Sequence, residues 1–111
     1  MAELATWYET IIAAHTAVTP AVSHSRRLKS DRYFVWQEDG GEDLGADDRH
    51  AERSMAGYTD LFTKIEFDPW ADALGESFNA SPRILWRLSS VDYEEDTGFW
   101  HWQWRWRVLG G

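Results

Sequence analysis

The sequence contains no cysteine, only three prolines in 111 residues, and far fewer basic than acidic side chains. The absence of cysteine excludes disulfides and thiolate metal sites, so a folded domain must rest on its core or on oligomerisation. Eleven Lys and Arg against nineteen Asp and Glu give a formal net charge of −8. This balance argues against a protein whose outer surface grips nucleic acid, because such binding needs basic side chains that neutralise phosphates. It suits solubility, or a surface past which DNA slides without adhering.

Long apolar runs are also missing, and no stretch approaches the roughly 20 residues that a membrane span requires. The beginning of the chain carries an early acid and no basic flank, so we expect no secretory signal and a cytoplasmic site of synthesis and assembly.

Tryptophan, in contrast, is abundant. Eight indoles in so short a chain mean that a few large side chains supply much of the burial, since each buries roughly 150–250 Å². The length suits a single domain over residues 1–111.

Two segments have the pattern of a helix. From Leu4 to Val18 apolar side chains recur at helical spacing, and Pro20 ends the segment. Asp68 and Pro69 are typical of a helix start, as N-cap and first helical residue respectively. The buried stripe of this second helix is predicted at Trp70, Ala73, Leu74 and Phe78.

The remaining segments have strand patterns. We predict a short strand within residues 21–25, a stronger aromatic and β-branched one over Arg32–Glu38, and a long one from Arg49 to about Ile65. Gly57, inside the long strand, is expected to mark a bulge or bend. With the hairpin described next, the element order is α–β–β–β–α–β–β. The predicted fold is therefore α+β, a mostly antiparallel twisted sheet with two helices packed on one face.

The last third of the chain predicts a β-hairpin, in which 83–91 and 99–109 flank an acidic tip at 94–98. Its second strand alternates strictly between aromatic and polar side chains. A period of two favours a strand, because a helix would scatter the indoles around its axis. One face is expected to carry Trp100, Trp102, Trp104, Trp106 and Val108, and the other His101, Gln103, Arg105 and Arg107.

Four short motifs follow one another in a fixed order between Asp31 and Val108. They are Tyr33-Phe34-Val35-Trp36, Ala46-Asp47-Asp48, Tyr58-Thr59-Asp60-Leu61-Phe62-Thr63 and Asp68-Pro69. This ordered set resembles the tail-terminator and tail-completion (head–tail joining) subunits of long-tailed bacteriophages. In that family an early aromatic strand, a loop, a long strand and a short helix precede a hairpin of aromatic strands. The last strand departs from the family's acidic pattern, being rich in Trp and Arg here.

The resemblance implies a structural role and no catalysis or cofactor. Subunits of this kind form a homo-oligomeric ring, often hexameric, that ends growth of the tail tube and joins it to the head connector. The implied partners are further copies of the chain, the tail-tube protein and the connector proteins, with no membrane. Genomic DNA would pass through the ring without specific binding. The implied location is the virion tail, assembled in the host cytoplasm.

Clustered charges are the candidate subunit-interface or channel residues. The acidic set lacks the alternating ligand spacing of a calcium loop, so a solvated loop that reaches a neighbouring subunit or lines the channel is preferred over a metal site. It comprises Glu38, Asp39, Glu42, Asp43, Asp47 and Asp48. Two basic clusters would face such acids on an adjacent subunit. They comprise Arg26, Arg27, Lys29 and Arg32, and, across the hairpin, Arg83, Arg87, Arg105 and Arg107.

The same residues suggest two other kinds of function, a binding module and an enzyme. The tryptophan face, if exposed, would instead make a small binding module for carbohydrate or single-stranded nucleic acid; core or subunit interface is the preferred interpretation. The histidines lack metal-ligand spacing, and His15 is expected to be a buried histidine whose ring nitrogens are hydrogen-bonded. His24 and His101 carry no local signature of a Ser/His/Asp site. We therefore predict no catalytic and no metal-binding residue.

Overall fold

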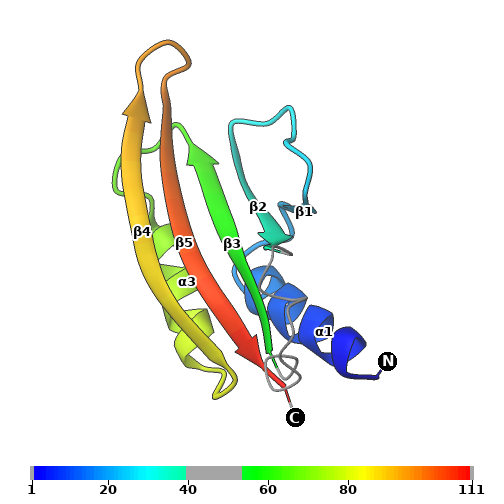
Figure 1. Ribbon diagram of the computed structural model, residues 1–111. Helices are drawn as coiled ribbons and strands as arrows, with labels where there is room; N and C mark the ends of the chain where they lie inside the picture. The colour runs from blue at the N-terminus through cyan, green and yellow to red at the C-terminus, as the bar shows by residue number, and fades with distance from the viewer. Residues whose placement is uncertain (1, 40–53, 111) are drawn as a thin grey trace.

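A computed structural model of the chain describes residues 2–39 and 54–110. Its elements are α1 (Ala2–Thr16), β1 (Val22–His24), β2 (Arg32–Glu38), β3 (Ser54–Thr63), α3 (Pro69–Asn79), β4 (Ile84–Glu94) and β5 (Phe99–Leu109). The strands form one five-stranded sheet in the order β1-β2-β3-β5-β4 (Figure 1). The α+β class and the chain order of the elements agree with the sequence-based prediction. The sheet is mixed, because β1 runs parallel to β2 while the other neighbours are antiparallel.

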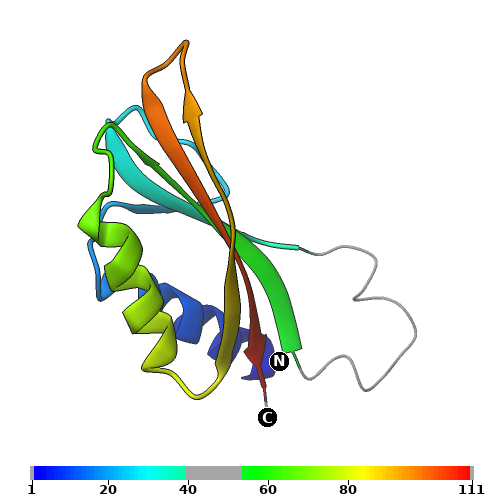
Figure 2. The same cartoon turned by 90° about the vertical axis from the view of Figure 1, so that its left-hand side faces the viewer.

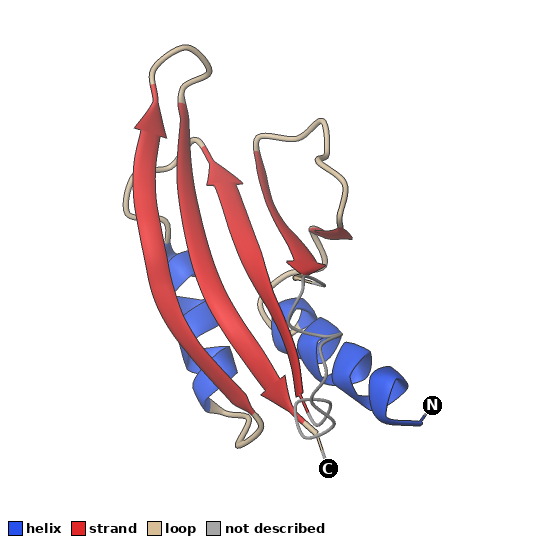
Figure 3. Cartoon of the chain, in the orientation of Figure 1, coloured by secondary structure: helices blue, strands red, loops and turns tan. Residues whose placement is uncertain are grey.

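Helices α1 and α3 lie on the same side of the twisted sheet, and the β4–β5 hairpin extends past them at one end (Figure 2). Figure 3 shows the same division into a sheet layer and a helix layer. Because the hairpin extends past the helices, the helix layer covers only part of the sheet, and the projecting end of the hairpin keeps both of its faces more open.

Among the described residues, no helix is both long and apolar enough to cross a membrane.

The indole face of β5 builds the centre of the core. Trp104 and Trp106 are only 2% and 3% exposed, and Val108 is fully buried. They pack with helix side chains such as Ile11 and Leu74. The predicted shared face is thus confirmed. Two further indoles of β5 are only partly buried, Trp100 and Trp102. Trp102 packs at the margin of the core and stacks on Trp104 with ring centroids 5.9 Å apart, whereas Trp100 lies nearer the hairpin tip beside Tyr93.

Helix α3 begins as predicted, with Asp68 as N-cap and a proline in its first turn. The Asp68 side chain accepts a hydrogen bond from the Trp70 backbone N at 2.9 Å. The predicted buried stripe is partly wrong, since the buried positions are Ala71, Leu74, Gly75 and Phe78. Trp70 lies at the margin of the core, stacked on Phe34 at 5.8 Å between ring centroids. The buried face of α3 is therefore rotated about the helix axis by roughly one residue from the predicted one.

Gly57 does not form the predicted bulge. The register runs through it without a shift, and it pairs with Glu38 on one side and Trp106 on the other. A Cβ atom at this position would lie 2.4 Å from the Trp106 ring and 2.5 Å from the Gln37 carbonyl oxygen. Glycine is thus required by close packing of the indole against the backbone. The register shift lies in β4 instead, between Leu88 and Ser90.

His15 is the buried, hydrogen-bonded histidine that the sequence predicted, with no exposed surface. Its Nδ1 lies 2.7 Å from the Ile11 carbonyl oxygen, and its Nε2 lies 2.8 Å from Thr59 Oγ1. Burial lowers the pKa of His15 from 6.5 to about 4, although the hydrogen bond to Ile11 opposes the shift. The folded chain therefore holds this ring neutral at pH 7 and ties α1 to β3 through it.

The lowered pKa of His15 predicts a loss of stability in mild acid. The unfolded chain takes up a proton near pH 6.5 and the folded chain only near pH 4, so stability falls as the pH drops between these values. The full effect is about 3 kcal/mol at most. Urea unfolding at a series of pH values measures it. In His15→Gln the free energy of unfolding should be lower at pH 7 but flatter across this window, and an unchanged slope would contradict the assignment.

Candidate interaction site

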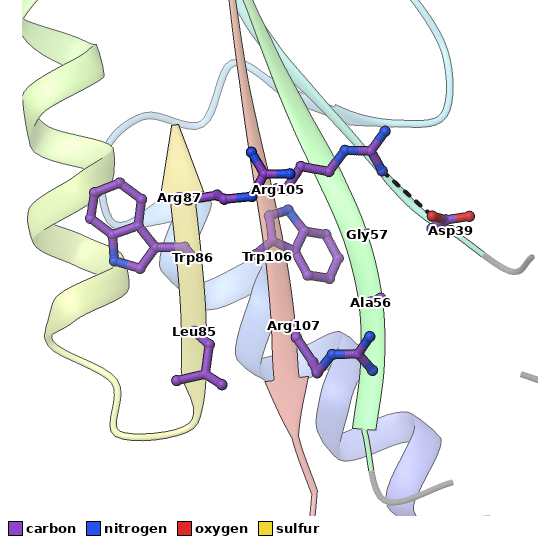
Figure 4. Close-up of a pocket in the computed structure, with 9 residues that line it drawn as sticks. All are labelled: Asp39, Ala56, Gly57, Leu85, Trp86, Arg87, Arg105, Trp106 and Arg107. Atoms are coloured by element: carbon purple, nitrogen blue, oxygen red, sulfur yellow. Dashed lines mark hydrogen bonds and ion pairs between the residues drawn. The ribbon is translucent and has the colours of Figure 1, made fainter. Parts of the chain in front are cut away.

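Three arginines gather on the face of the sheet that the helices leave uncovered (Figure 4). Arg87 of β4 pairs directly with Arg105 of β5, and Arg107 lies two residues further along β5. They line one side of an open hollow of about 410 Å³, whose other lining residues include Asp39, Gly57 and a half-exposed Leu85. We call Arg87, Arg105 and Arg107 the arginine cluster. Arg83, which the sequence placed with them, does not line this hollow.

The arginine cluster is only partly neutralised. Arg105 Nη1 lies 3.5 Å from Asp39 Oδ2, and Arg107 donates a hydrogen bond of 2.7 Å to Ser54 Oγ. Over residues 2–39 and 54–110, the Arg87 side chain makes no hydrogen bond or ion pair. Like charges directly opposite each other on neighbouring strands destabilise a sheet. The hollow is therefore lined by three guanidinium groups, which stay charged at every physiological pH, and by one carboxylate among the described residues, that of Asp39.

Glu38, a predicted interface acid, is engaged within its own chain. Tyr8 donates a hydrogen bond to one carboxylate oxygen, and His24 Nε2 lies 2.6 Å from the other. Burial by itself would raise the pKa of Glu38, but the hydrogen bonds from His24 and Tyr8 outweigh it and lower the pKa. His24 in turn stacks on Trp36, with ring centroids 4.0 Å apart. Glu38 thus ties α1, β1 and β2 together, which is a structural role.

The first basic cluster is not assembled in the structure. Arg32 contacts the buried Asp68 across the helix side of the sheet. The Arg27 guanidinium lies 4.0 Å from the Phe62 ring centroid on the opposite side, and the pKa of Arg27 is raised chiefly by its hydrogen bond with Tyr33. Arg26 and Lys29 are exposed. The acids predicted to meet these groups, apart from Glu38 and Asp39, lie outside the described residues: Glu42, Asp43, Asp47 and Asp48.

A second polar group on the uncovered face was not anticipated. Asp60 Oδ1 lies 2.7 Å from His101 Nε2 and accepts a hydrogen bond from Gln103 at 3.0 Å. His101 also stacks on Phe62, with ring centroids 4.4 Å apart. The sequence shows these polar residues on alternate positions, but their meeting depends on the β3–β5 register. The contacts hold β3 and β5 together on this face and leave the carboxylate of Asp60 satisfied.

The β4 strand forms one edge of the sheet over its full length of 11 residues. Within the described chain its outer side has no partner strand. Four of its apolar side chains are 40–56% exposed: Leu85, Leu88, Val91 and Tyr93. Tyr93 pairs with Trp100 near the tip, with ring centroids 4.8 Å apart. An unpaired edge with exposed apolar groups is a typical surface for association with another chain.

A metal site is not evident among residues 2–39 and 54–110, where no three His, Asp or Glu side chains are grouped closely enough to hold an ion. Comparison with known proteins was negative throughout: no family model, no curated protein and no solved structure matches the chain. The functional argument therefore rests on the residues and their geometry.

Proposed function

We propose that this chain is a structural subunit of a phage tail, which forms a ring that terminates the tail tube and joins it to the head connector. The observation that carries the proposal is the projecting β4–β5 hairpin, with its unpaired outer strand and exposed apolar side chains. Assembly proteins of this kind act through interface area and symmetry, and their contact surfaces stay exposed until a partner covers them. The hairpin is such a surface.

The motifs behind the resemblance support the proposal by their positions. The aromatic motif Tyr33–Trp36 lies at the centre of β2, and the motif Tyr58–Thr63 forms the second half of β3. Asp68 caps α3. The motifs therefore set the sheet and the start of the helix, leaving the hairpin and the charged uncovered face as the parts available for partners.

The alternative function, a module that presents indoles to carbohydrate or single-stranded nucleic acid, needs accessible rings. Trp104 and Trp106 lie in the core at 2% and 3% exposure, so very little of either ring is open to a ligand. Trp100, which lies beside Tyr93, and Trp102 are the partly exposed rings of the row. So few accessible rings on a narrow hairpin favour a protein contact, because platforms for polymers stack successive units on several rings.

The mass of the chain in solution tests the proposal, measured by light scattering over a range of concentrations and again with the tail-tube protein encoded by the same phage. A closed oligomer, alone or formed on addition of tube protein, is the expected result. A chain that stays monomeric and leaves the tube protein unbound in both experiments would contradict it. An unrelated tube protein serves as the control for non-specific sticking of the hairpin.

A further inference from the structure

The arginine cluster has an excess of positive charge in a chain that is otherwise strongly acidic. Arg87 faces Arg105 across the strand pair and has no partner of its own in the described chain, while the net charge of the whole chain is −8. A cross-strand pair of like charges costs stability in the isolated subunit. Such a cost is offset if an external anion binds between the guanidinium groups, whose fork geometry matches carboxylates and phosphates.

The hairpin tip of the same chain offers that anion. Glu95 and Asp96 are exposed in the turn between β4 and β5. Glu94 beside them is already engaged, since it accepts a hydrogen bond of 2.9 Å from Thr97 and lies 3.6 Å from His101. Over residues 2–39 and 54–110, neither the Glu95 nor the Asp96 side chain makes a hydrogen bond or ion pair. The tip thus presents two free carboxylates at the far end of the molecule.

The tip cannot reach the arginine cluster of its own chain. Glu94 pairs with Phe99 at the tip, and Arg105 lies six residues further along β5. At about 3.3 Å per residue this separates the two groups by roughly 20 Å along a continuous strand. Figure 1 shows the tip and the lower half of the hairpin at opposite ends. Complementary charges that are fixed apart on one rigid element can meet only between two copies.

We infer that the carboxylates of the hairpin tip, Glu95 and Asp96, bind the arginine cluster of a second copy of this chain. The inference rests on the proposed function, because it supplies the contact from which a ring is built. The two surfaces differ, so the contact is head-to-tail and propagates from copy to copy, closing into a ring when the rotation between neighbours allows it. Leu85, which is 56% exposed at the hollow, gives the contact an apolar border.

Nucleic acid is the competing occupant, since guanidinium groups also bind phosphate. The shape of the cluster favours the carboxylates of a second copy. The three arginines line a compact hollow, not a stripe that would follow a phosphate backbone. A duplex oligonucleotide is therefore included in the test.

The test uses the full chain and three variants: Arg87→Glu, Glu95→Lys with Asp96→Lys, and Lys29→Glu as a matched control. Lys29 is exposed and does not line the hollow, so its reversal changes the net charge by the same amount as Arg87→Glu. Arg87→Glu should fold at least as well as the wild type, since it replaces a repulsive pair with an attractive one opposite Arg105. Its melting temperature therefore separates lost association from lost folding.

Self-association, measured by sedimentation over a concentration series, should weaken by at least about tenfold in Arg87→Glu and in the tip variant, and not in Lys29→Glu. An equimolar mixture of Arg87→Glu and the tip variant should regain association, because each supplies the charge that the other lacks. Unchanged association in both variants, no recovery on mixing, or a wild type that never associates would overturn the inference. So would oligonucleotide binding that Arg87→Glu removes while self-association persists. None of these outcomes decides the proposed tail function, which is tested separately by the binding of this chain to the tail-tube protein.

Discussion

Asp68→Ala is expected to lower the free energy of unfolding by about 3–5 kcal/mol, among the largest effects of any single change in this chain. The Asp68 side chain is completely buried and accepts four hydrogen bonds. Two come from Arg32, at 2.9 and 2.5 Å, and one from Thr63 Oγ1 at 2.7 Å. The fourth is the N-cap bond from Trp70. Removing the carboxylate leaves all these donors without their acceptor, and loss of the cap alone typically costs about 1 kcal/mol.

Urea unfolding of Asp68→Ala, Asp68→Asn and Asp72→Ala measures this effect and its origin. Asn keeps the volume and an acceptor for the cap, so it should cost clearly less than Ala. The loss from wild type to Asp68→Asn reports the charge, and the further loss to Asp68→Ala reports the acceptor and the volume. Asp72 lies exposed in the same first turn, so its replacement is expected to stay within about 1 kcal/mol. A loss for Asp68→Ala no greater than that for Asp72→Ala would contradict the role assigned to this carboxylate.

The same carboxylate makes the chain sensitive to strong acid. Burial alone would raise the pKa of Asp68, but the hydrogen bonds from Arg32, the Trp70 backbone and Thr63 outweigh it, so the pKa lies below its ordinary value of 3.8. A carboxyl with a lowered pKa stabilises the fold above its unfolded pKa, and this contribution disappears as the pH falls through the folded pKa. The acid limb of unfolding below about pH 4 should therefore be shallower in Asp68→Ala.

Gly57→Ala is expected to lower the free energy of unfolding by about 3 kcal/mol, the upper range for overpacking a filled core. The added methyl would lie 2.4 Å from the Trp106 ring and 2.5 Å from the Gln37 carbonyl oxygen. Relief requires either a shift of a buried indole or a separation of β2 from β3, and the indole is itself held by a hydrogen bond of 2.8 Å to Thr59. Either movement would disturb neighbouring residues as well as position 57, so we expect the cost to be large.

Gly75→Ala is the matched control for Gly57→Ala. Its added methyl meets the Trp86 ring edge at 3.0 Å, and Trp86 is only partly buried and can tilt. Alanine also gains about 1 kcal/mol of helix propensity over glycine inside α3, so the net change should stay within about 1 kcal/mol of zero. Chemical unfolding that gave equal losses for the two variants would contradict the close packing of Trp106 against β3.

The elements were predictable where one residue type constrains the backbone strongly. The pair Asp68-Pro69 fixes where α3 begins, and the strict alternation from Trp100 onwards fixes a strand and its faces. Pro20 only limits the first helix, since α1 ends at Thr16, two residues before the predicted end at Val18. The short strand β1 was found, but not its parallel pairing with β2. Pairing direction depends on how the chain returns to the sheet, which no local pattern encodes.

The contacts of the candidate site depend on strand register, and for this reason only part of them could be predicted from the sequence. Arg87, Arg105 and Arg107 were expected on one face, but the direct opposition of Arg87 and Arg105 follows from the β4–β5 pairing. The register shift between Leu88 and Ser90 exchanges the faces of β4 beyond it, so that Val91 and not Ser90 lies opposite Trp102. No glycine or proline marks that shift in the sequence.

The role of Gly57 also depends on strand register and could not be predicted from the local sequence. A glycine inside a strand pattern indicates either a bulge or a close approach of another group, and the sequence alone does not separate them. In the structure the reason is a close approach, because the Trp106 ring of the neighbouring strand β5 packs directly against Gly57. Another indole, Trp104, lies two positions away on the same strand. Only the pairing of β3 with β5 identifies which tryptophan it is.

The most direct test of the proposed tail role is to delete this chain from the phage or prophage that the proposal requires to encode it, and to examine the resulting particles by electron microscopy. A subunit that terminates the tube and joins it to the connector should, when absent, leave tubes of uncontrolled length and heads without attached tails, and supplying the chain in trans should restore normal particles. Normal tails joined to heads in its absence would contradict the account.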